Sequence, residues 1–374
     1  MLDVYLLTLT LAVGIGLAAT LASYVASRAV ERIGAFHQRR GVNERPRWGG
    51  AAVFLTFALV PFIASALSDQ AAGLFSPKSH EFLAFLGACS VIFAVGFLDD
   101  WLVLDWRPKL IAQVGAAIAV YMAGYSIDRI GLPWGATFAL GPIAPVLTVL
   151  WVVFFTNALN LIDGRDGVAT GVAVLAAATL AMIAASADHP TVALLPMAAA
   201  GAGLGLLPFN LPPASVFLGD SGALVLGFVL GALSIRATTG SSDAVFIAVP
   251  IVALGLPILD TVLAFVRRLL DFRHPLLRDE DHIHHRLEEA GFGPRGLVVV
   301  LYTVSCLFAF GALMLHYVHV FGLEVLVLVG TLLLVAGILT KLGYLLSLWN
   351  SASIVWVRER LRGDYVPIEV SDRD

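Results

Sequence analysis

The sequence predicts an all-α integral membrane protein with about eleven transmembrane helices, and three observations support this prediction. The chain of 374 residues is 59% hydrophobic and only 13% charged, and its mean hydropathy is +0.89. Several apolar segments reach the length of about 18 residues that a helix needs to cross a bilayer. Most of the 23 Lys and Arg residues lie on one side of these segments. This composition excludes an ordinary soluble globular protein.

The apolar segments fall into eleven ranges. They are 3–27, 48–67, 82–98, 109–125, 142–159, 168–186, 191–207, 221–237, 244–266, 297–317 and 323–348. Residues 1–348 are therefore expected to form one transmembrane domain, followed by a tail at 349–374. No basic segment precedes the first range, so we expect a retained helix and not a cleaved signal peptide. Residues 126–142, with Gly131-Leu-Pro-Trp-Gly135 at their centre, predict a short hairpin.

The basic residues predict the orientation of the chain. If the first connection is cytoplasmic, only Lys78, Arg129 and Arg236 lie on the opposite side, and Lys341 lies within the last span. Connections rich in Lys and Arg stay on the cytoplasmic side of a membrane. We therefore expect the N-terminus outside, the C-terminus in the cytoplasm, and the hairpin on the extracytoplasmic side.

With this orientation, the unusual polar clusters all fall on the cytoplasmic face. The connections concerned are 28–48, 99–109, 157–168, 208–220 and 267–296. Carboxylates beside a bilayer are costly, so they are usually paired, bound to metal or functional. Five connections that are distant in sequence thus predict one site on one side of the membrane.

Two of these connections carry aspartates that also have a simpler interpretation. Asp99 and Asp100 follow an apolar span, at a helix C-terminus where the helix dipole disfavours anions. A bound cation or a proton-transfer role explains them better than a solvated loop does. Asp220 begins a span, where it could cap the helix or belong to the same site as Asn210.

The stretch from Asn157 to Gly167 holds the densest group of oxygen side chains. Asn157, Asn160 and Asp163 recur at every third residue, which places them near one helix face. Asp163 and Asp166 each precede a glycine, so the stretch also fits a simple turn between helices. Oxygen ligands without thiolates favour Mg²⁺ over zinc.

The histidines and the remaining polar residues leave several interpretations open. His282, His284, His285 and Arg286 fit a diphosphate or a sugar, although a zinc site and a solvated loop are alternatives. Asp260 lies inside the ninth span, where it is either functional or bonded to Thr261 or a neighbouring helix. The two cysteines lie in apolar segments and predict neither a disulfide nor a metal site.

These clusters favour a reaction between a soluble anionic substrate and a lipid. Mg²⁺ bridges the phosphates of a nucleoside diphosphate and neutralises charge on the leaving group. The chain contains no Walker lysine motif, so nothing in the sequence indicates an ATPase. Carboxylates in the membrane also suit a proton-coupled transporter, but that class predicts paired halves, and the sequence contains no internal repeat.

The motifs resemble those of the polyprenyl-phosphate N-acetylhexosamine-1-phosphate transferases, glycosyltransferase family 4. The resemblance covers roughly residues 45–290 in the family's order. Its motifs are Trp48-Gly-Gly50, Phe97-Leu-Asp-Asp100, Asn157 to Gly167, Phe217-Leu-Gly-Asp-Ser-Gly222, Pro257-Ile-Leu-Asp-Thr261 and Asp281-His-Ile-His-His-Arg-Leu287. The resemblance implies transfer of a sugar 1-phosphate from a UDP-sugar to undecaprenyl phosphate with release of UMP. It also implies the same number of spans and the same orientation.

The resemblance implies a role for each site residue. Asp220 and Asn160 correspond to Mg²⁺ ligands, with Mn²⁺ as a substitute metal. Asp99, Asp100, Asp163 and Asp166 correspond to the catalytic carboxylates, with Asp99 either a base or a group that positions the lipid phosphate. The other correspondences are Asn210, Phe217 and Asp166 with the nucleotide, His282, His284, His285 and Arg286 with the sugar diphosphate, and Lys109 and Arg107 with the lipid phosphate.

The histidine motif selects a branch of the family. His-x-His-His-Arg-Leu resembles the branch that uses UDP-GlcNAc and starts O-antigen, enterobacterial common antigen, teichoic acid or arabinogalactan linkage synthesis. The muramoyl-pentapeptide branch has His-His-His-Phe-Glu, which is absent here. Another UDP-N-acetylhexosamine or a muramoyl-pentapeptide donor stays an alternative. The expected setting is the bacterial cytoplasmic membrane, with membrane lipids as surroundings, no nucleic acid, and a homodimer left open.

Overall fold

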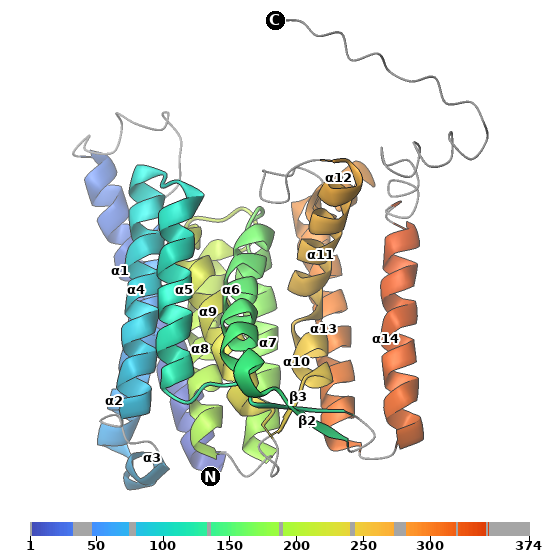
Figure 1. Cartoon of the computed structure of the whole chain (residues 1–374). Helices are drawn as coiled ribbons and strands as arrows, with labels where there is room; N and C mark the ends of the chain where they lie inside the picture. The colour runs from blue at the N-terminus through green and yellow to red at the C-terminus, as the bar shows by residue number, and fades with distance from the viewer. Residues whose placement is uncertain are drawn as a thin grey trace, which may run out of the picture.

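The computed structural model describes residues 2–32, 47–74, 80–132, 136–186, 190–239, 244–272, 282–318, 321–341 and 343. Within these residues the chain forms a bundle of long helices that run roughly parallel to one another (Figure 1). A small sheet and the short helix α12 lie at opposite ends of this bundle (Figure 1). The connections 33–46 and 273–281 and the predicted tail at 349–374 lie outside the described residues.

The helices begin and end close to the predicted span limits. Their bounds are α1 (Leu2–Arg32), α2 (Gly49–Leu67), α3 (Asp69–Leu74), α4 (His80–Leu102), α5 (Trp106–Met122), η1 (Gly141–Ile143), α6 (Ala144–Ile162), α7 (Val168–Ser186), α8 (Pro190–Asn210), α9 (Gly219–Ala237), α10 (Ala248–Ala253), α11 (Gly255–Leu270), α12 (Ile283–Glu289), α13 (Pro294–Tyr317) and α14 (Phe321–Lys341).

Eight helices in the described part of the chain are long and apolar enough to cross a membrane. They are α1, α2, α4, α6, α7, α8, α9 and α13, and α5, α11 and α14 lie at three further predicted spans. The prediction of a helical membrane protein with many spans is therefore confirmed. The count of eleven, the orientation and the division into 1–348 and 349–374 stay predictions.

The predicted hairpin is present. Strand β1 (Arg129–Gly131) pairs antiparallel with β2 (Thr137–Ala139). A third strand, β3 (Ala244–Phe246), pairs in parallel with β1, and no local pattern in the sequence indicates this pairing. The sheet order β2-β1-β3 thus ties the connection before α6 to the connection before α10.

The prediction of one continuous ninth span at 244–266 is wrong. The range instead contains β3, the short helix α10 and most of α11. The helices are separated at Leu254, whose φ of −104° and ψ of 23° are not helical. Pro257, near the start of α11, cannot donate the backbone hydrogen bond that would continue a helix from α10. An unbroken run of apolar residues does not reveal such a break.

Helix α9 forms the centre of the bundle and is buried along almost its whole length. Its glycines allow neighbouring backbones to approach closely. A Cβ at Gly227 would lie 2.6 Å from the carbonyl oxygen of Phe155 in α6. A Cβ at Gly205 in α8 would lie 2.6 Å from the Cα of Gly16 in α1. Small residues at helix contacts are the usual means of packing in membranes, where lipid competes for apolar side chains.

Candidate active site

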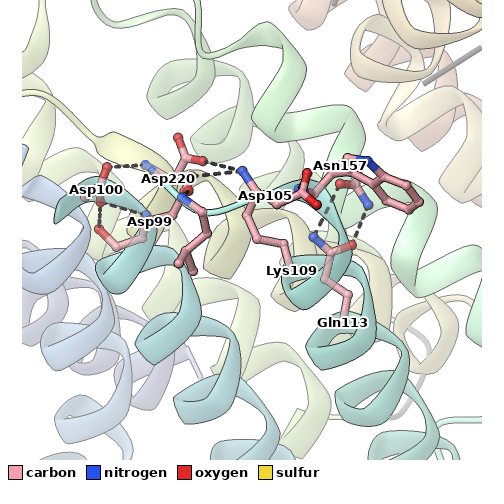
Figure 2. A network of polar contacts seen from close by, with 10 residues as sticks. Asp99, Asp100, Asp105, Lys109, Gln113, Asn157 and Asp220 are labelled. Atoms are coloured by element: carbon pink, nitrogen blue, oxygen red, sulfur yellow. Dashed lines mark hydrogen bonds and ion pairs between the residues drawn. The ribbon is translucent and has the colours of Figure 1, made fainter. Parts of the chain in front are cut away.

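A group of charged side chains lies where α4 ends and where α5 and α9 begin (Figure 2). Lys109 of α5 lies between Asp99 of α4 and Asp220 of α9. Its Nζ is 2.8 Å from Oδ2 of Asp99 and 3.4 Å from Oδ2 of Asp220. The side chains are mostly shielded from solvent, which strengthens charge interactions relative to bulk water. We call Asp99, Lys109 and Asp220 the carboxylate–lysine cluster.

Asp99 also shapes the connection between α4 and α5. Its Oδ1 accepts a hydrogen bond of 2.6 Å from the backbone N–H of Leu104. One carboxylate oxygen therefore holds the turn that leads into α5, while the other holds Lys109 in the first part of that helix. The structure thus brings together Asp99, Lys109 and Asp220, which sequence reasoning assigned to three different roles.

Asp100 points away from Lys109 and caps α9. Its Oδ1 accepts from the N–H of Asp220 at 2.9 Å, and its Oδ2 accepts from the N–H and the hydroxyl of Ser221 at 3.0 and 2.7 Å. A carboxylate at a helix N-terminus satisfies free N–H groups and favours the helix dipole. The unfavourable position of Asp100 at the end of α4 is thus offset by its position at the start of α9.

The cap assigned to Asp220 as an alternative role is made by Asp100 instead. Asp220 lies in the first turn of α9, Leu218 occupies the N-cap position, and Leu218 makes no side-chain cap bond. The carboxylate of Asp220 therefore remains available on the side of Lys109.

Glycines permit the close approach that this arrangement requires. The N–H groups of Gly49 and Gly50 donate to the carbonyl oxygens of Phe217 and Leu218 at 3.0 and 2.8 Å. A Cβ at Gly96 of α4 would lie 2.7 Å from the Cα of Ser221. The Trp48-Gly-Gly50 motif therefore supports the start of α9, which explains why it accompanies the acidic motifs.

The loop 163–167 connects α6 to α7 beside this cluster. Burial, together with the carboxylates of Asp220 and Asp100, raises the pKa of Asp163 well above its usual range. Oδ2 of Asp166 accepts from the N–H of Ala214 at 2.9 Å, which joins the loop to the connection between α8 and α9. Gly167 has a φ of +77°, which glycine adopts readily, and its carbonyl accepts from the Tyr302 hydroxyl at 2.7 Å.

The two asparagines of this region differ in their surroundings. Asn157 forms a reciprocal amide pair with Gln113 of α5, at 2.6 and 3.3 Å, and also donates to the carbonyl of Val153 (Figure 2). Asn160, one turn later, is half-buried near the end of α6. Sequence reasoning missed Gln113, although it follows Lys109 by four residues and so shares its helix face.

Asn210 is fully buried and organises the loop that follows it. Its Oδ1 accepts from the Thr170 hydroxyl at 2.7 Å, and its Nδ2 donates to the carbonyl of Val216 at 2.9 Å. The half-buried Phe217 comes directly after Val216. In this structure Asn210 therefore places the backbone that carries Phe217, and the predicted contacts of both residues with a nucleotide stay predictions.

The histidine motif begins at the N-terminus of α12, against α11. Nδ1 of His282 lies 2.8 Å from Oδ2 of Asp260, and the N–H of Ile283 donates to Oδ1 of Asp260 at 2.8 Å. The ring of His284 lies close to that of His285, with centroids 4.2 Å apart. A Cβ at Gly164 would lie 2.7 Å from Nε2 of His284. The motif thus lies against the 163–167 loop, as the sequence predicted.

His284 is neutral at neutral pH. Burial, and next the neighbouring His285, lower its pKa to about 4. This histidine can exchange hydrogen bonds with a ligand, but it supplies no positive charge. Any cationic contribution from this motif must therefore come from another residue, such as Arg286 in the same helix.

An ion pair fixes α12 to the 163–167 loop. Nε and Nη2 of Arg165 each lie 2.5 Å from a different carboxylate oxygen of Glu288. This contact lowers the pKa of Glu288. Sequence reasoning missed the pair, because the two residues are 123 positions apart and neither belongs to an unusual local pattern.

Lys109 and Arg107, the two candidate residues for the lipid phosphate, both lie near the start of α5 but differ in their surroundings. Lys109 belongs to the carboxylate–lysine cluster. Arg107 is exposed, and its guanidinium carbon lies 5.5 Å from the centre of the Trp106 ring. The catalytic, metal, nucleotide, sugar and lipid-phosphate roles assigned to the site residues stay predictions, and the structure adds their positions.

The fold and the site together define a helical membrane protein with an acidic candidate active site at one end of its bundle. Residues 82–238 match the sequence model of glycosyl transferase family 4. The chain is 35% identical over 296 residues to a probable undecaprenyl-phosphate N-acetylglucosaminyl 1-phosphate transferase of Bacillus subtilis, covering 78% of this chain and 80% of the relative. The chain belongs to glycosyl transferase family 4.

Two further relatives differ from the first in the lipid or in the sugar for which they are named. A decaprenyl-phosphate N-acetylglucosaminephosphotransferase of Mycolicibacterium smegmatis is 33% identical over 328 residues, which cover 80% of each chain. A phospho-N-acetylmuramoyl-pentapeptide-transferase of Staphylococcus epidermidis is 27% identical over 277 residues, which cover 70% of this chain and 81% of the relative. The resemblance drawn from the motifs is thus confirmed at the level of the family.

Proposed function

We propose that the protein transfers N-acetylglucosamine 1-phosphate from UDP-GlcNAc to undecaprenyl phosphate or a related polyprenyl phosphate, and releases UMP. The relatives from Bacillus subtilis and Mycolicibacterium smegmatis are named for this sugar and for polyprenyl phosphates. The observation that carries the proposal is the carboxylate–lysine cluster, which lies at the end of a membrane bundle where a lipid phosphate and a soluble donor can meet. The lipid product would start a polysaccharide of the cell envelope.

In the proposed reaction, a phosphate oxygen of the lipid attacks the β-phosphorus of the donor. The bond between this phosphorus and the bridging oxygen breaks, and the electron pair leaves with UMP. The product is a lipid diphosphate that carries the sugar. Such transfers depend mainly on alignment and on neutralisation of charge.

Lys109 is the residue that we assign to the acceptor phosphate. Its ammonium is held by Asp99 at 2.8 Å and lies at the start of α5. A phosphate monoester is already largely ionised near neutral pH, because its second pKa is about 6. Little proton abstraction is therefore required, and Asp99 serves to position Lys109 and the acceptor.

The residues present fit a divalent metal ion. Asp99, Asp100, Asp163 and Asp220 outnumber the nearby cationic residues Lys109 and Arg47, and Asp220 and Asp100 contribute to the raised pKa of Asp163. Among the described residues, no three His, Cys, Asp or Glu side chains form a ready metal cage. Mg²⁺ commonly takes one or two carboxylates and completes its shell with phosphate oxygens and water.

We assign Asp220 and Asn160 as the protein ligands of Mg²⁺, with Mn²⁺ as a substitute. The ion would supply charge neutralisation at the diphosphate. The carboxylate of Asp220 lies beside that of Asp99 and contacts the Lys109 ammonium at 3.4 Å, so an additional cation there would reduce the repulsion between the two carboxylates.

The donor is assigned to the surface between the 163–167 loop, the loop after Asn210 and α12. Phe217 and Asp166 would contact the uridine, with Asn210 fixing the backbone around them. The neutral His284 would exchange hydrogen bonds with the sugar, and Arg286 would face the diphosphate. UDP-GlcNAc is favoured over a muramoyl-pentapeptide donor because the similarity to the N-acetylglucosamine relatives extends over 296 and 328 residues, against 277 and 200 for the muramoyl-pentapeptide relatives.

The setting follows from the fold and the charge distribution. Since basic residues concentrate on the side of the acidic loops, we place the site at the cytoplasmic face of the bacterial inner membrane. The small sheet lies at the opposite end of the bundle (Figure 1), which agrees with an extracytoplasmic hairpin.

The test is a transfer assay with purified protein, undecaprenyl phosphate and a panel of labelled UDP-sugars. We expect UMP release and a labelled lipid with UDP-GlcNAc, both abolished by EDTA and restored by Mg²⁺. UDP-GalNAc and the muramoyl-pentapeptide donor serve as the competing substrates. Absence of a lipid-linked product with every UDP-sugar refutes the proposed reaction, and activity that survives EDTA refutes the metal requirement.

A further inference from the structure

Asp260 is an ionisable residue inside α11 that the proposed reaction does not use. Its side chain is only 3% exposed to solvent. A buried carboxylate is costly unless its charge and its lone pairs are satisfied. Both of its oxygens have a partner, and both partners belong to the start of the histidine motif.

The geometry of this contact selects one form of the His282 ring. Oδ2 of Asp260 lies 2.8 Å from Nδ1 of His282, and an ionised carboxylate only accepts hydrogen bonds. The hydrogen must therefore lie on Nδ1. In a neutral imidazole this leaves Nε2 as a bare acceptor, since the bond at one ring nitrogen determines the state of the other.

The second oxygen of Asp260 fixes the backbone on which this ring is carried. Oδ1 accepts from the N–H of Ile283 at 2.8 Å, which satisfies a free donor in the first turn of α12. The His282 ring is thus restrained both at its own nitrogen and at the next peptide. It is also 5% exposed, so few alternative positions are open to it.

A row of rings connects His282 to the acidic loop. The ring of His282 is stacked with that of His284, with centroids 5.6 Å apart and planes inclined by 7°. His284 in turn lies against Gly164, and Gly164 comes between Asp163 and Asp166 in the sequence of the loop. The state of the His282 ring is therefore set by a residue of α11, at a place that adjoins the proposed donor surface.

We propose that Asp260 is a positioning residue for the transfer reaction, which holds His282 with its hydrogen on Nδ1 and so presents Nε2 as an acceptor to a hydroxyl or amide N–H of the donor's N-acetylhexosamine. The inference rests on the proposed function for the identity of the donor. Asp260 acts through His282 and does not itself contact the substrate.

The substitution Asp260→Asn separates this role from a merely structural one. The Asn oxygen can still accept from the N–H of Ile283, so the tie to α12 is retained. The Asn amide nitrogen, however, donates a hydrogen bond to Nδ1 of His282, which moves the ring hydrogen to Nε2. In this nearly isosteric variant, Nε2 of His282 therefore carries a hydrogen. It can no longer accept a hydrogen bond from the UDP-sugar.

We expect the spectrum and the kinetics to change together. In protein labelled with ¹⁵N-histidine at about pH 8, where imidazoles are ordinarily neutral, His282 should change from the Nδ1–H to the Nε2–H form. The KM for UDP-GlcNAc should rise about 10- to 100-fold. In the variant two N–H or O–H groups would face each other where the wild-type protein forms a buried hydrogen bond to the sugar. The KM for undecaprenyl phosphate should stay unchanged.

Two control variants sharpen the test. Thr261→Val alters the neighbouring residue, whose hydroxyl has no hydrogen-bond partner among the described residues, and should change neither the spectrum nor the KM. Asp260→Asn combined with His282→Ala should bind the donor like His282→Ala alone, because Asp260 acts only through that ring. Additive losses in the double variant contradict the proposal.

The remaining outcomes are equally decisive. An Nε2–H ring in the wild-type protein overturns the proposal without any variant, even if Asp260→Asn fails to fold. A wild-type KM for the donor in a variant whose ring form has changed overturns it as well. If the wild-type protein transfers no sugar phosphate at all, the proposed function fails, whereas the ring form of His282 is still measured independently.

Discussion

The substitution Lys109→Met tests most clearly what the Lys109 ammonium does. The ammonium either supplies a charge that two carboxylates share or makes only a structural contact. Methionine keeps the apolar stem of the side chain and removes only the ammonium. In the structure this ammonium lies 2.8 Å from Asp99 and 3.4 Å from Asp220. At 3.4 Å, the attraction between two unit charges is about 1 kcal/mol in water and about 5 kcal/mol at an effective dielectric constant of about 20.

The net effect must be smaller than this gross attraction, because the ammonium also loses hydration in the cluster. We take about 1–2 kcal/mol, which corresponds to about 5- to 30-fold in a binding constant. Without the ammonium, Asp220 should bind Mg²⁺ more tightly by this factor. At the same time kcat/KM for undecaprenyl phosphate should fall about 10- to 100-fold, because the acceptor phosphate loses a charged partner.

The assay is UMP release, measured across Mg²⁺ concentrations and across lipid concentrations. Lys341→Met, at the exposed end of α14, removes a lysine far from the site in sequence and serves as the matched control. A Lys109→Met variant with the wild-type Mg²⁺ requirement and the wild-type KM for lipid would refute the assignment of this residue.

Three further predictions concern the same site. Asp220→Asn should raise the Mg²⁺ concentration needed for half-maximal rate, which is the direction opposite to that of Lys109→Met, and should not change the thermal midpoint of unfolding. A wild-type rate of this variant at low Mg²⁺ would show that Asp220 does not bind the metal. Arg165→Glu should weaken donor binding by about 0.5–1 kcal/mol, the usual range for a partly exposed ion pair, and Glu288→Arg in the same chain should restore it; no recovery in the double variant argues against the pair. The pKa of His284 is lowered to about 4 in the folded protein. Between about pH 6.5 and 4, the unfolded chain therefore binds a proton at this residue that the folded protein does not bind. The free energy of unfolding should fall for this reason by up to about 2 kcal/mol at pH 5. His284→Gln should remove this loss, as measured by thermal unfolding at pH 7.5 and 5; an equal loss in both proteins would show that other groups are responsible.

The sequence predicted the features that depend on local hydropathy and on the sidedness of charge. Helices are present at each predicted span, and the polar clusters around Asp99, Asp163, Asp220 and His284 lie together. Such predictions succeed because a membrane requires about 20 consecutive apolar residues for each helix and because polar residues are costly elsewhere. The convergence of the clusters then followed from topology alone.

The sequence did not predict which partner each polar group would take. Asp100 caps α9 through Asp220, which is 120 positions further along the chain. Asp260 accepts from the backbone N–H of Ile283, which is 23 positions further along. Neither distance is visible in a local pattern, because the partners meet only once the helices are packed. The same reason applies to β3, whose three residues pair with β1 and interrupt an apolar stretch that otherwise resembles a span.

The break in the ninth span also bears on the transporter alternative. Discontinuous helices and buried carboxylates are typical of secondary transporters. Here, however, both oxygens of Asp260 bind the start of α12, and the relatives named for their activity are transferases. The interrupted helix therefore serves to bring the histidine motif to the acidic loop.

The most direct test of the central claim follows the β-phosphorus of the donor. UDP-GlcNAc labelled at that atom is incubated with the purified protein, undecaprenyl phosphate and Mg²⁺, and the lipid and nucleotide products are separated. Transfer of a sugar 1-phosphate places the label in the lipid and leaves unlabelled UMP. Label retained in UDP beside a glycosylated lipid would mean that the attack occurs at the sugar carbon, and would contradict the account.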